Sequence, residues 1–125
     1  MKRLAVVGVL VLSTFGCDSG PDGPGDITGT LRTPGFAVGG VVLEVVGQGV
    51  QRFSGTGGTK VFWAPQTDPK VFRVVVIGEG GGDLEFKVSV EDRGKQKPRA
   101  TVINLVDTEN RTLPVTTDYK VQFSY

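Results

Sequence analysis

The sequence predicts an all-β protein built as a single antiparallel β-sandwich of about eight strands. Three observations support this fold. Apolar and polar residues alternate with a period of two in several segments, and no stretch keeps an apolar stripe at helical spacing. Short apolar runs are separated by clusters of Gly, Pro, Asn and Asp, at the spacing of about 8–12 residues that is typical of sandwiches and barrels. Strands with one apolar and one polar face indicate antiparallel sheets.

Each predicted strand is an apolar-rich run bounded by turn residues. Residues 84–91 and 119–125 alternate most regularly, with an aliphatic or aromatic side chain at every second position and Glu, Lys, Gln or Ser between. Glycine clusters at 55–58 and 78–83 suit tight returns between strands, because glycine adopts positive φ without a Cβ clash. In chain order the eight predicted strands are residues 27–32, 41–46, 50–53, 60–64, 70–77, 84–91, 99–107 and 119–125.

The alternation also predicts which side chains face the core. Seven residues are expected on the inward faces of two packed sheets: Leu43, Val74, Val76, Phe86, Val88, Val121 and Phe123. An apolar set is left facing outward, together with Glu44 and Arg73, and forms a candidate interaction patch: Val42, Val46, Val71, Val75 and Ile77. Three readings stay open for this patch: a partner or second copy covers it, a loop such as 66–69 or the linker covers it, or its residues are scattered and harmless.

Composition limits the chain to one modest domain. The chain has 125 residues, 38% of them hydrophobic, with no histidine and a single cysteine, so no internal disulfide can support the core. The formal net charge is +1, and without Lys2 and Arg3 the remaining 12 basic residues face 13 acidic ones. No charge excess draws the chain to nucleic acid.

The N-terminus has the layout of a secretory signal, with Lys2 and Arg3, an apolar run over 4–12, and Gly16 before Cys17. The apolar run is too short for a permanent span, which needs about 20 residues. The segment resembles a bacterial lipoprotein signal peptide, in which the residue at the position of Cys17 is lipidated and becomes the new N-terminus.

Two positions of the lipoprotein motif differ here, since Thr14 stands at the usual Leu and Phe15 at the usual small residue. The resemblance implies a signal peptide over 1–16 and a lipidated Cys17 that anchors the protein to a bacterial membrane of the cell envelope, periplasmic or surface-exposed. An ordinary secretory leader with an idle cysteine and a cytoplasmic chain with a chance apolar start remain the alternatives.

The predicted domains follow from the same change in composition. Residues 17–26 form the lipidated cysteine and a Gly/Pro/Asp linker, and residues 27–125 form the sandwich. The runs 40–47, 71–78 and 88–92 are similar to strands of cohesin-like and other immunoglobulin-like sandwiches of bacterial surface proteins. The resemblance implies an immunoglobulin-like fold and transfers no binding residue.

The sequence contains few residues that could form a catalytic or metal-binding site. Without histidine, Ser-His-Asp and Cys-His centres and His-based zinc sites are excluded. Carboxylates remain at Asp83 and Glu85 and at Glu91 and Asp92, all expected to be solvated. Loop oxygens of 82–83 or of Asp107, Glu109 and Asn110 are candidate calcium ligands, but neither set matches a twelve-residue calcium loop. The sequence therefore predicts no catalytic, cofactor-binding or metal-binding residue, and no cofactor.

A basic loop and a single tryptophan each have two interpretations, a binding role at the surface or a purely structural role. Arg93, Lys95, Lys97 and Arg99 form a basic loop, either solvated or able to bind a polyanion, and Trp63 is either a core side chain or a sugar-stacking platform. We expect a non-catalytic interaction module with an envelope protein or polysaccharide as partner and no nucleic acid. The alternatives are a structural or spacer lipoprotein, and a carbohydrate-binding or carboxylate-based hydrolase domain. The oligomeric state is open.

Overall fold

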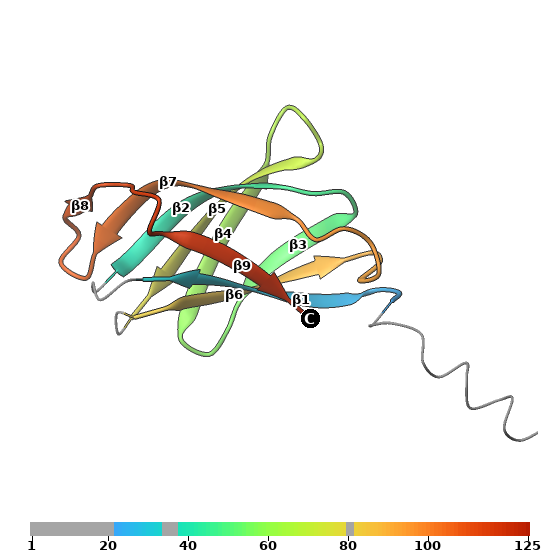
Figure 1. Ribbon diagram of the computed structural model, residues 1–125, viewed down its shortest axis with the longest axis horizontal. Helices are drawn as coiled ribbons and strands as arrows, with labels where there is room; N and C mark the ends of the chain where they lie inside the picture. Colours follow the sequence, from blue (N-terminus) through green and yellow to red (C-terminus); the bar gives the residue numbers. More distant parts are fainter. Residues whose placement is uncertain (1–21, 34–37, 80–81) are drawn as a thin grey trace, which may run out of the picture.

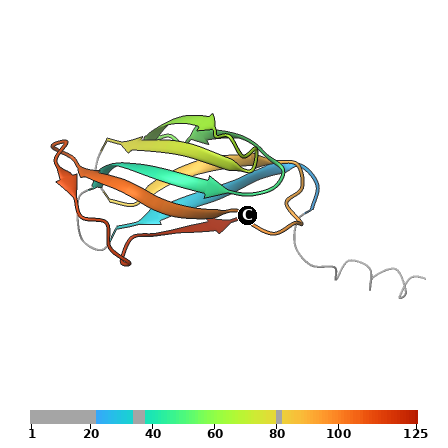
Figure 2. The same ribbon diagram turned by 90° about the horizontal axis from the view of Figure 1, so that it is seen from above.

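The computed structural model describes residues 22–33, 38–79 and 82–125 of the chain. The predicted signal peptide 1–16 and Cys17 lie outside the described residues. The described residues form nine strands and no helix, arranged as two sheets packed face to face (Figures 1 and 2). The strands are β1 (Gly25–Arg32), β2 (Val38–Val46), β3 (Val50–Gly55), β4 (Thr59–Pro65), β5 (Val71–Gly78), β6 (Leu84–Val90), β7 (Arg99–Asp107), β8 (Thr112–Leu113) and β9 (Lys120–Ser124).

The predicted antiparallel β-sandwich is confirmed. One sheet has four strands in the order β3-β6-β1-β9, and the other has five in the order β4-β5-β2-β7-β8. Neighbouring strands pair antiparallel throughout, from the Gly25–Val90 pair of β1 and β6 to the Leu105–Leu113 pair of β7 and β8. All eight predicted strands are present. The additional strand, β8, has only two residues, which is too short to show an alternation in the sequence.

The chain changes sheet several times, and one of these passages is at Gly55. This glycine ends β3, and a Cβ atom placed on it would lie 2.1 Å from the carbonyl oxygen of Thr59 at the start of β4. Only glycine allows the backbone to fold back this closely. The hydroxyl of Thr59 then donates to the carbonyl oxygen of Glu85 at 2.6 Å, which links the turn to β6. The glycine cluster predicted as a turn therefore joins the two layers.

One apolar core fills the space between the sheets. Of the seven residues predicted to face inward, five are buried, and the other two, Val121 and Phe123 on the edge strand β9, are partly buried and pack against the core. The predicted register is therefore correct. The buried apolar side chains are Ile27, Leu31, Val38, Val41, Leu43, Val45, Phe53, Phe72, Val74, Val76, Leu84, Phe86, Val88, Val90, Leu105 and Tyr119.

Phe86 is among the largest side chains of this core that are fully buried. Its ring centre lies 6.5 Å from that of Phe53 and 6.0 Å from that of Phe123, the second contact being edge-to-face. Gly29 pairs with Phe86 across β1 and β6, and a Cβ atom at Gly29 would lie 2.5 Å from the ring. The absence of a side chain at Gly29 thus makes room for the aromatic ring.

Truncation of this ring tests the register of β6. We expect Phe86→Ala to lower the free energy of unfolding by about 3–5 kcal/mol, because the change removes buried surface and leaves a cavity. The neighbouring Glu85 is exposed, so Glu85→Ala is expected to change stability by less than about 0.5 kcal/mol. Urea unfolding of the two variants measures both values, and equal losses would mean that the two faces of β6 are exchanged.

Candidate interaction surfaces

The outer surface of the five-stranded sheet carries a row of apolar side chains. Phe62 of β4 pairs with Val75 of β5, and Val75 pairs with Val42 of β2, so these three side chains stand side by side across the sheet. Phe62 is 59% exposed and the two valines are half-buried. On β5, two positions along from Val75, Ile77 is 42% exposed. We call the surface formed by Val42, Val46, Phe62, Val71, Val75 and Ile77 the apolar face.

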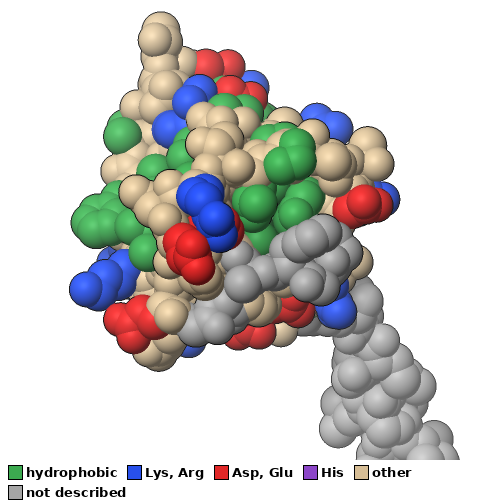
Figure 3. Space-filling model, turned by 90° about the vertical axis from the view of Figure 1, so that its left-hand side faces the viewer, with side chains coloured by type: hydrophobic (Ala, Val, Ile, Leu, Met, Phe, Trp, Pro, Cys, Tyr) green, Lys and Arg blue, Asp and Glu red, His purple; other side chains and the backbone are tan. Residues whose placement is uncertain are grey.

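All five residues of the predicted patch lie on this face. Val46 pairs with Val71 near one end of β2 and β5, Val42 pairs with Val75, and Ile77 lies opposite Gly40. Figure 3 looks onto one end of the sandwich and shows hydrophobic side chains reaching the surface between charged groups. The alternation in these two strands therefore predicts the outward side correctly for the five residues, while their role as an interaction patch stays a prediction.

Phe62 is the member of the apolar face that the sequence analysis missed. It stands next to Trp63 in the chain, and the neighbouring Val61 and Ala64 give β4 no clean alternation. The structure separates the two aromatic residues, since Phe62 faces outward beside Val75 whereas Trp63 packs inward. The outward position of Phe62 could have been predicted only from its alternation with Lys60 and Ala64, which lie on the same side of β4.

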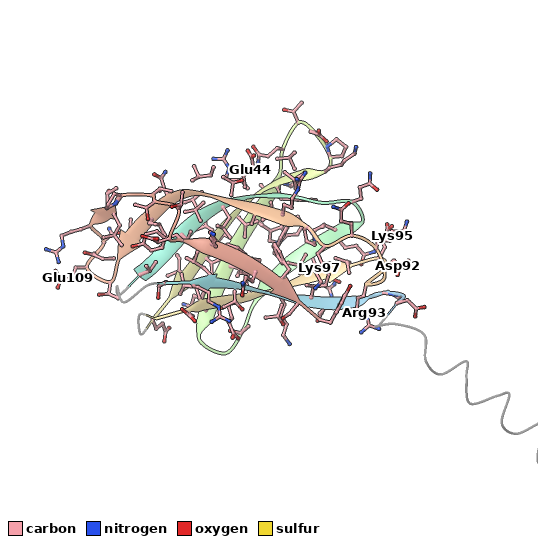
Figure 4. All side chains as sticks on the ribbon, in the orientation of Figure 1. Glu44, Asp92, Arg93, Lys95, Lys97 and Glu109 are labelled. Carbon is pink, nitrogen blue, oxygen red and sulfur yellow. The ribbon has the colours of Figure 1, made fainter. Side chains whose placement is uncertain are left out.

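An ion pair interrupts the apolar face. Glu44 and Arg73 pair across β2 and β5, and their side-chain nitrogen and oxygen lie 3.9 Å apart, both partly exposed. Figure 4 shows Glu44 on the upper side of the sandwich. Exposed pairs of this kind contribute little stability. The two charges offset each other, whereas the exposed Lys60 opposite Ile77 and Arg99 opposite Val46 add positive charge at the border of the face.

The β4–β5 hairpin does not fold over the apolar face. Its backbone closes on itself, because the amide of Gln66 donates to the carbonyl of Val71 at 2.9 Å and the amide of Val71 donates to the carbonyl of Asp68 at 3.0 Å. Figure 1 shows the hairpin projecting past the end of the sheet. The loop 66–69, which the sequence offers as a possible cover, therefore does not shield these side chains.

Trp63 belongs to the core edge and not to an open platform. Its ring centre lies 5.5 Å from that of Phe53 and 6.0 Å from that of Phe72, and 37% of the residue is exposed. A sugar-binding platform needs one free aromatic face, but this ring is packed between two sheets at their open side. The geometry therefore favours a structural role for Trp63 over a role as a sugar-stacking platform.

The start of β1 is attached to the loop between β6 and β7. A carboxylate oxygen of Asp92 accepts hydrogen bonds from the amides of Gly23 and Gly94, each at 2.9 Å. The amide of Arg93 donates to the carbonyl of Gly23 at 2.8 Å, and its guanidinium donates to the carbonyl of Asp22 at 3.1 Å. Figure 4 shows Asp92 and Arg93 at the end of the sandwich where β1 begins. We call this arrangement the Asp92 clamp.

The remaining carboxylates are engaged locally or exposed. Asp107 accepts bonds from the amides of Glu109 and Arg111, and the guanidinium of Arg111 contacts the carboxylates of both Asp107 and Glu109. The amide of Arg111 is the main cause that holds the pKa of Asp107 below its usual value. The guanidinium of Arg111 therefore already occupies the carboxylates that were candidate calcium ligands.

Asp83 and Glu85 lie at a shallow depression of about 240 Å³ that also includes Glu79. All three are exposed, and Asp83 accepts a bond from the amide of Thr33 at 3.0 Å. A carboxyl that acts as a catalytic acid is usually desolvated, which these exposed groups are not. Within residues 22–33, 38–79 and 82–125, no three His, Cys, Asp or Glu side chains are grouped to hold a metal ion.

Comparison with protein-family models, with curated proteins and with solved structures finds no match to this chain. In the described part of the chain, no helix has the length and apolar character needed to cross a membrane.

Acidification is expected to loosen the Asp92 clamp. Bonds from the amides of Gly94 and Gly23 hold the pKa of Asp92 below its ordinary value of 3.8. Because the folded pKa is lowered, the clamp is fully formed above ~4, the pKa of an unfolded aspartate, and is lost as pH falls through the folded value. In an NMR titration both glycine amide resonances should move together with an apparent pKa below 3.8. They should not titrate in Asp92→Asn, and a midpoint above that value would contradict the clamp.

Proposed function

We propose that this chain is a lipid-anchored protein of the bacterial cell envelope whose sandwich is a non-catalytic interaction module for a protein partner. The observation that carries the proposal is the apolar face, where Phe62, Val75 and Val42 stand in one row and Phe62 is 59% exposed. Contiguous apolar surface of this kind on a small domain marks an interaction site more often than it occurs idly.

The chemistry of the apolar face favours a protein over a polysaccharide. Its side chains are aliphatic apart from Phe62. Glu44 and Arg73 within it pair with each other, and the cations Lys60 and Arg99 lie at its border. Sugar sites combine aromatic platforms with hydrogen-bonding groups directed at hydroxyls, whereas protein interfaces have apolar centres with aromatic anchors. Phe62 has the position of such an anchor, at the edge strand of its sheet.

The anchor part of the proposal rests on the leader and on the direction from which the chain enters the domain. Gly16 and Cys17 match the cleavage and modification positions of a lipoprotein signal. From Cys17 to Gly23, where the Asp92 clamp holds the chain, a fully extended backbone reaches at most roughly 20 Å. A lipid on Cys17 would thus hold one end of the sandwich close to the headgroups and leave the apolar face at its side accessible.

The alternatives receive less support. A spacer needs no exposed apolar row, and a carboxylate-based hydrolase needs two carboxyls across a cleft, one of them desolvated. The depression with Asp83 and Glu85 is shallow and its carboxylates are exposed. A carbohydrate-binding role would need Trp63 to present a free ring face, but that ring packs against Phe53 and Phe72.

Acylation of Cys17 is the first test. Mass spectrometry of the N-terminal peptide from the membrane fraction should show a mature chain that starts at Cys17 and carries a diacylglyceryl group. The protein should also partition into detergent, and Cys17→Ala should abolish the lipid mass and the partitioning. A wild-type peptide without lipid, together with an Ala variant that still fractionates with membranes, would contradict the anchor.

The apolar face is tested with a charge placed at its centre. A photoreactive amino acid at position 62 should give a discrete cross-linked product in intact cells, whose mass separates a partner protein from a second copy. Val75→Lys should leave the fold intact and abolish this product. Ser89→Lys is the matched control, because Ser89 is also half-buried and belongs to the other sheet.

A Val75→Lys variant that no longer unfolds cooperatively would instead place Val75 in the core. Persistence of the product in a folded Val75→Lys variant would show that the apolar face does not bind the partner.

A further inference from the structure

Four basic side chains meet around one depression at the end of the sandwich where β1 begins. The depression has a volume of about 260 Å³ and is lined by Lys70, Lys95, Lys97 and Arg99, together with Val46, Gly47, Gln48 and Gln96. No acidic side chain is among these lining residues. Figure 4 shows Lys95 and Lys97 at the same end as Asp92 and Arg93. We call this depression the basic pocket.

The cations of the basic pocket are not neutralised by ion pairs. Among the described residues, ion pairs within 4.0 Å involve only Arg73 and Arg111 as cations. Carboxylates lie nearby: Asp68 and Asp92 accept bonds from backbone amides, Asp92 also interacts electrostatically with Lys95, and the exposed Glu91 lies beside Gly49. Four cations around one depression with no acidic lining residue still outnumber these charges, and the resulting positive potential attracts anions.

The pocket is built from three segments that the fold holds together. The amide of Gly47, in the β2–β3 turn, donates to the carbonyl of Lys70 in the β4–β5 hairpin at 2.9 Å. A Cβ atom on Gly47 would lie 2.8 Å from the Cβ of Pro98, so the β6–β7 loop packs directly on this turn. The ammonium of Lys97 lies 4.5 Å from the ring centre of Tyr125. The backbone segments that carry the four cations are therefore held together by the tertiary structure.

We infer that the basic pocket binds the phosphate group of anionic phospholipid headgroups and thereby turns this end of the sandwich toward the membrane. Ammonium and guanidinium groups with neighbouring side-chain amides, here Gln48 and Gln96, are the donors that a phosphate oxygen accepts from. The choice of a lipid rests on the proposed anchor, because a lipid on Cys17 holds this end within roughly 20 Å of the surface. The Asp92 clamp fixes the entry of the chain beside the pocket.

The experiment measures vesicle binding of the full chain made by cell-free synthesis without membranes, in which Cys17 carries no lipid. Flotation compares vesicles of phosphatidylcholine alone with vesicles of equal parts phosphatidylcholine and phosphatidylglycerol. The pocket variant replaces Lys70, Lys95, Lys97 and Arg99 by Gln. The matched control replaces four exposed cations elsewhere by Gln, namely Arg52, Lys60, Lys87 and Lys120. The leader is the same in every chain, so it cancels from the comparison.

We expect salt-sensitive binding of the wild type to the anionic vesicles beyond its binding to phosphatidylcholine. One basic residue near an anionic surface strengthens binding by roughly fivefold. The pocket variant should therefore lose at least about tenfold in affinity, and the control variant much less. Equal losses in both variants would mean that total charge and not the pocket binds the lipid, which would overturn the inference.

Two further outcomes would also overturn the inference. The first is equal binding to both vesicle types. The second is release of the protein by inorganic phosphate at the concentration of the accessible headgroups, which would identify a free anion as the ligand. If the pocket variant does not fold, the double variant of Lys95 and Lys97 takes its place, since both are exposed. A failure to find lipid on Cys17 leaves this measurement intact, so the two proposals fail separately.

Discussion

The packing of two sheets on a single apolar layer is the constraint on which the rest of the structure depends. The chain has one cysteine, so no internal disulfide connects the layers, and burial of apolar side chains supplies the cohesion. Phe86 and Gly29 show how closely the layer is matched, because the ring occupies the space that a side chain at Gly29 would need. Once Phe86 points inward, the period of two determines the face of every other residue on β6, and pairing passes that choice to β1 and β3.

The same constraint explains why the apolar face exists. In β2 and β5 the inward positions are filled by buried residues such as Leu43 and Val74, yet the alternate positions are also largely aliphatic. Strands that are apolar on both sides are typical of sheets covered on both faces. Here the five-stranded sheet has the core on one face, and on the other Phe62, Val75 and Val42 are left at the surface. The surplus of apolar residues has no role in the core, which is why we assign it to a partner.

The two ends of the sandwich differ in character. At one end, the Asp92 clamp attaches the start of β1 to the β6–β7 loop, and the basic pocket lies beside it. At the other end, the turn after β7 is closed by the contacts of Arg111 with Asp107 and Glu109, which leave that turn's charges paired. Unpaired cations occur elsewhere as well, such as Arg32 and Lys120 at the end of β1 away from the clamp, whereas four of them line one depression beside the clamp. In our proposals this cluster orients a tethered domain, with the basic pocket toward the membrane and most of the apolar face accessible at the side.

The sequence by itself determined the class of fold, the location of eight strands and, in the strands that alternate cleanly, the inward or outward face of the residues. It could do so because a strand exposes alternate side chains to opposite faces, so these properties are local. Only the tertiary structure decided which strands are neighbours, and therefore that Phe62 joins Val75 and Val42 in one row and that Lys70 shares a pocket with Lys95. Strand order and the meeting of loops depend on contacts between segments far apart in the chain, and no local period encodes such contacts.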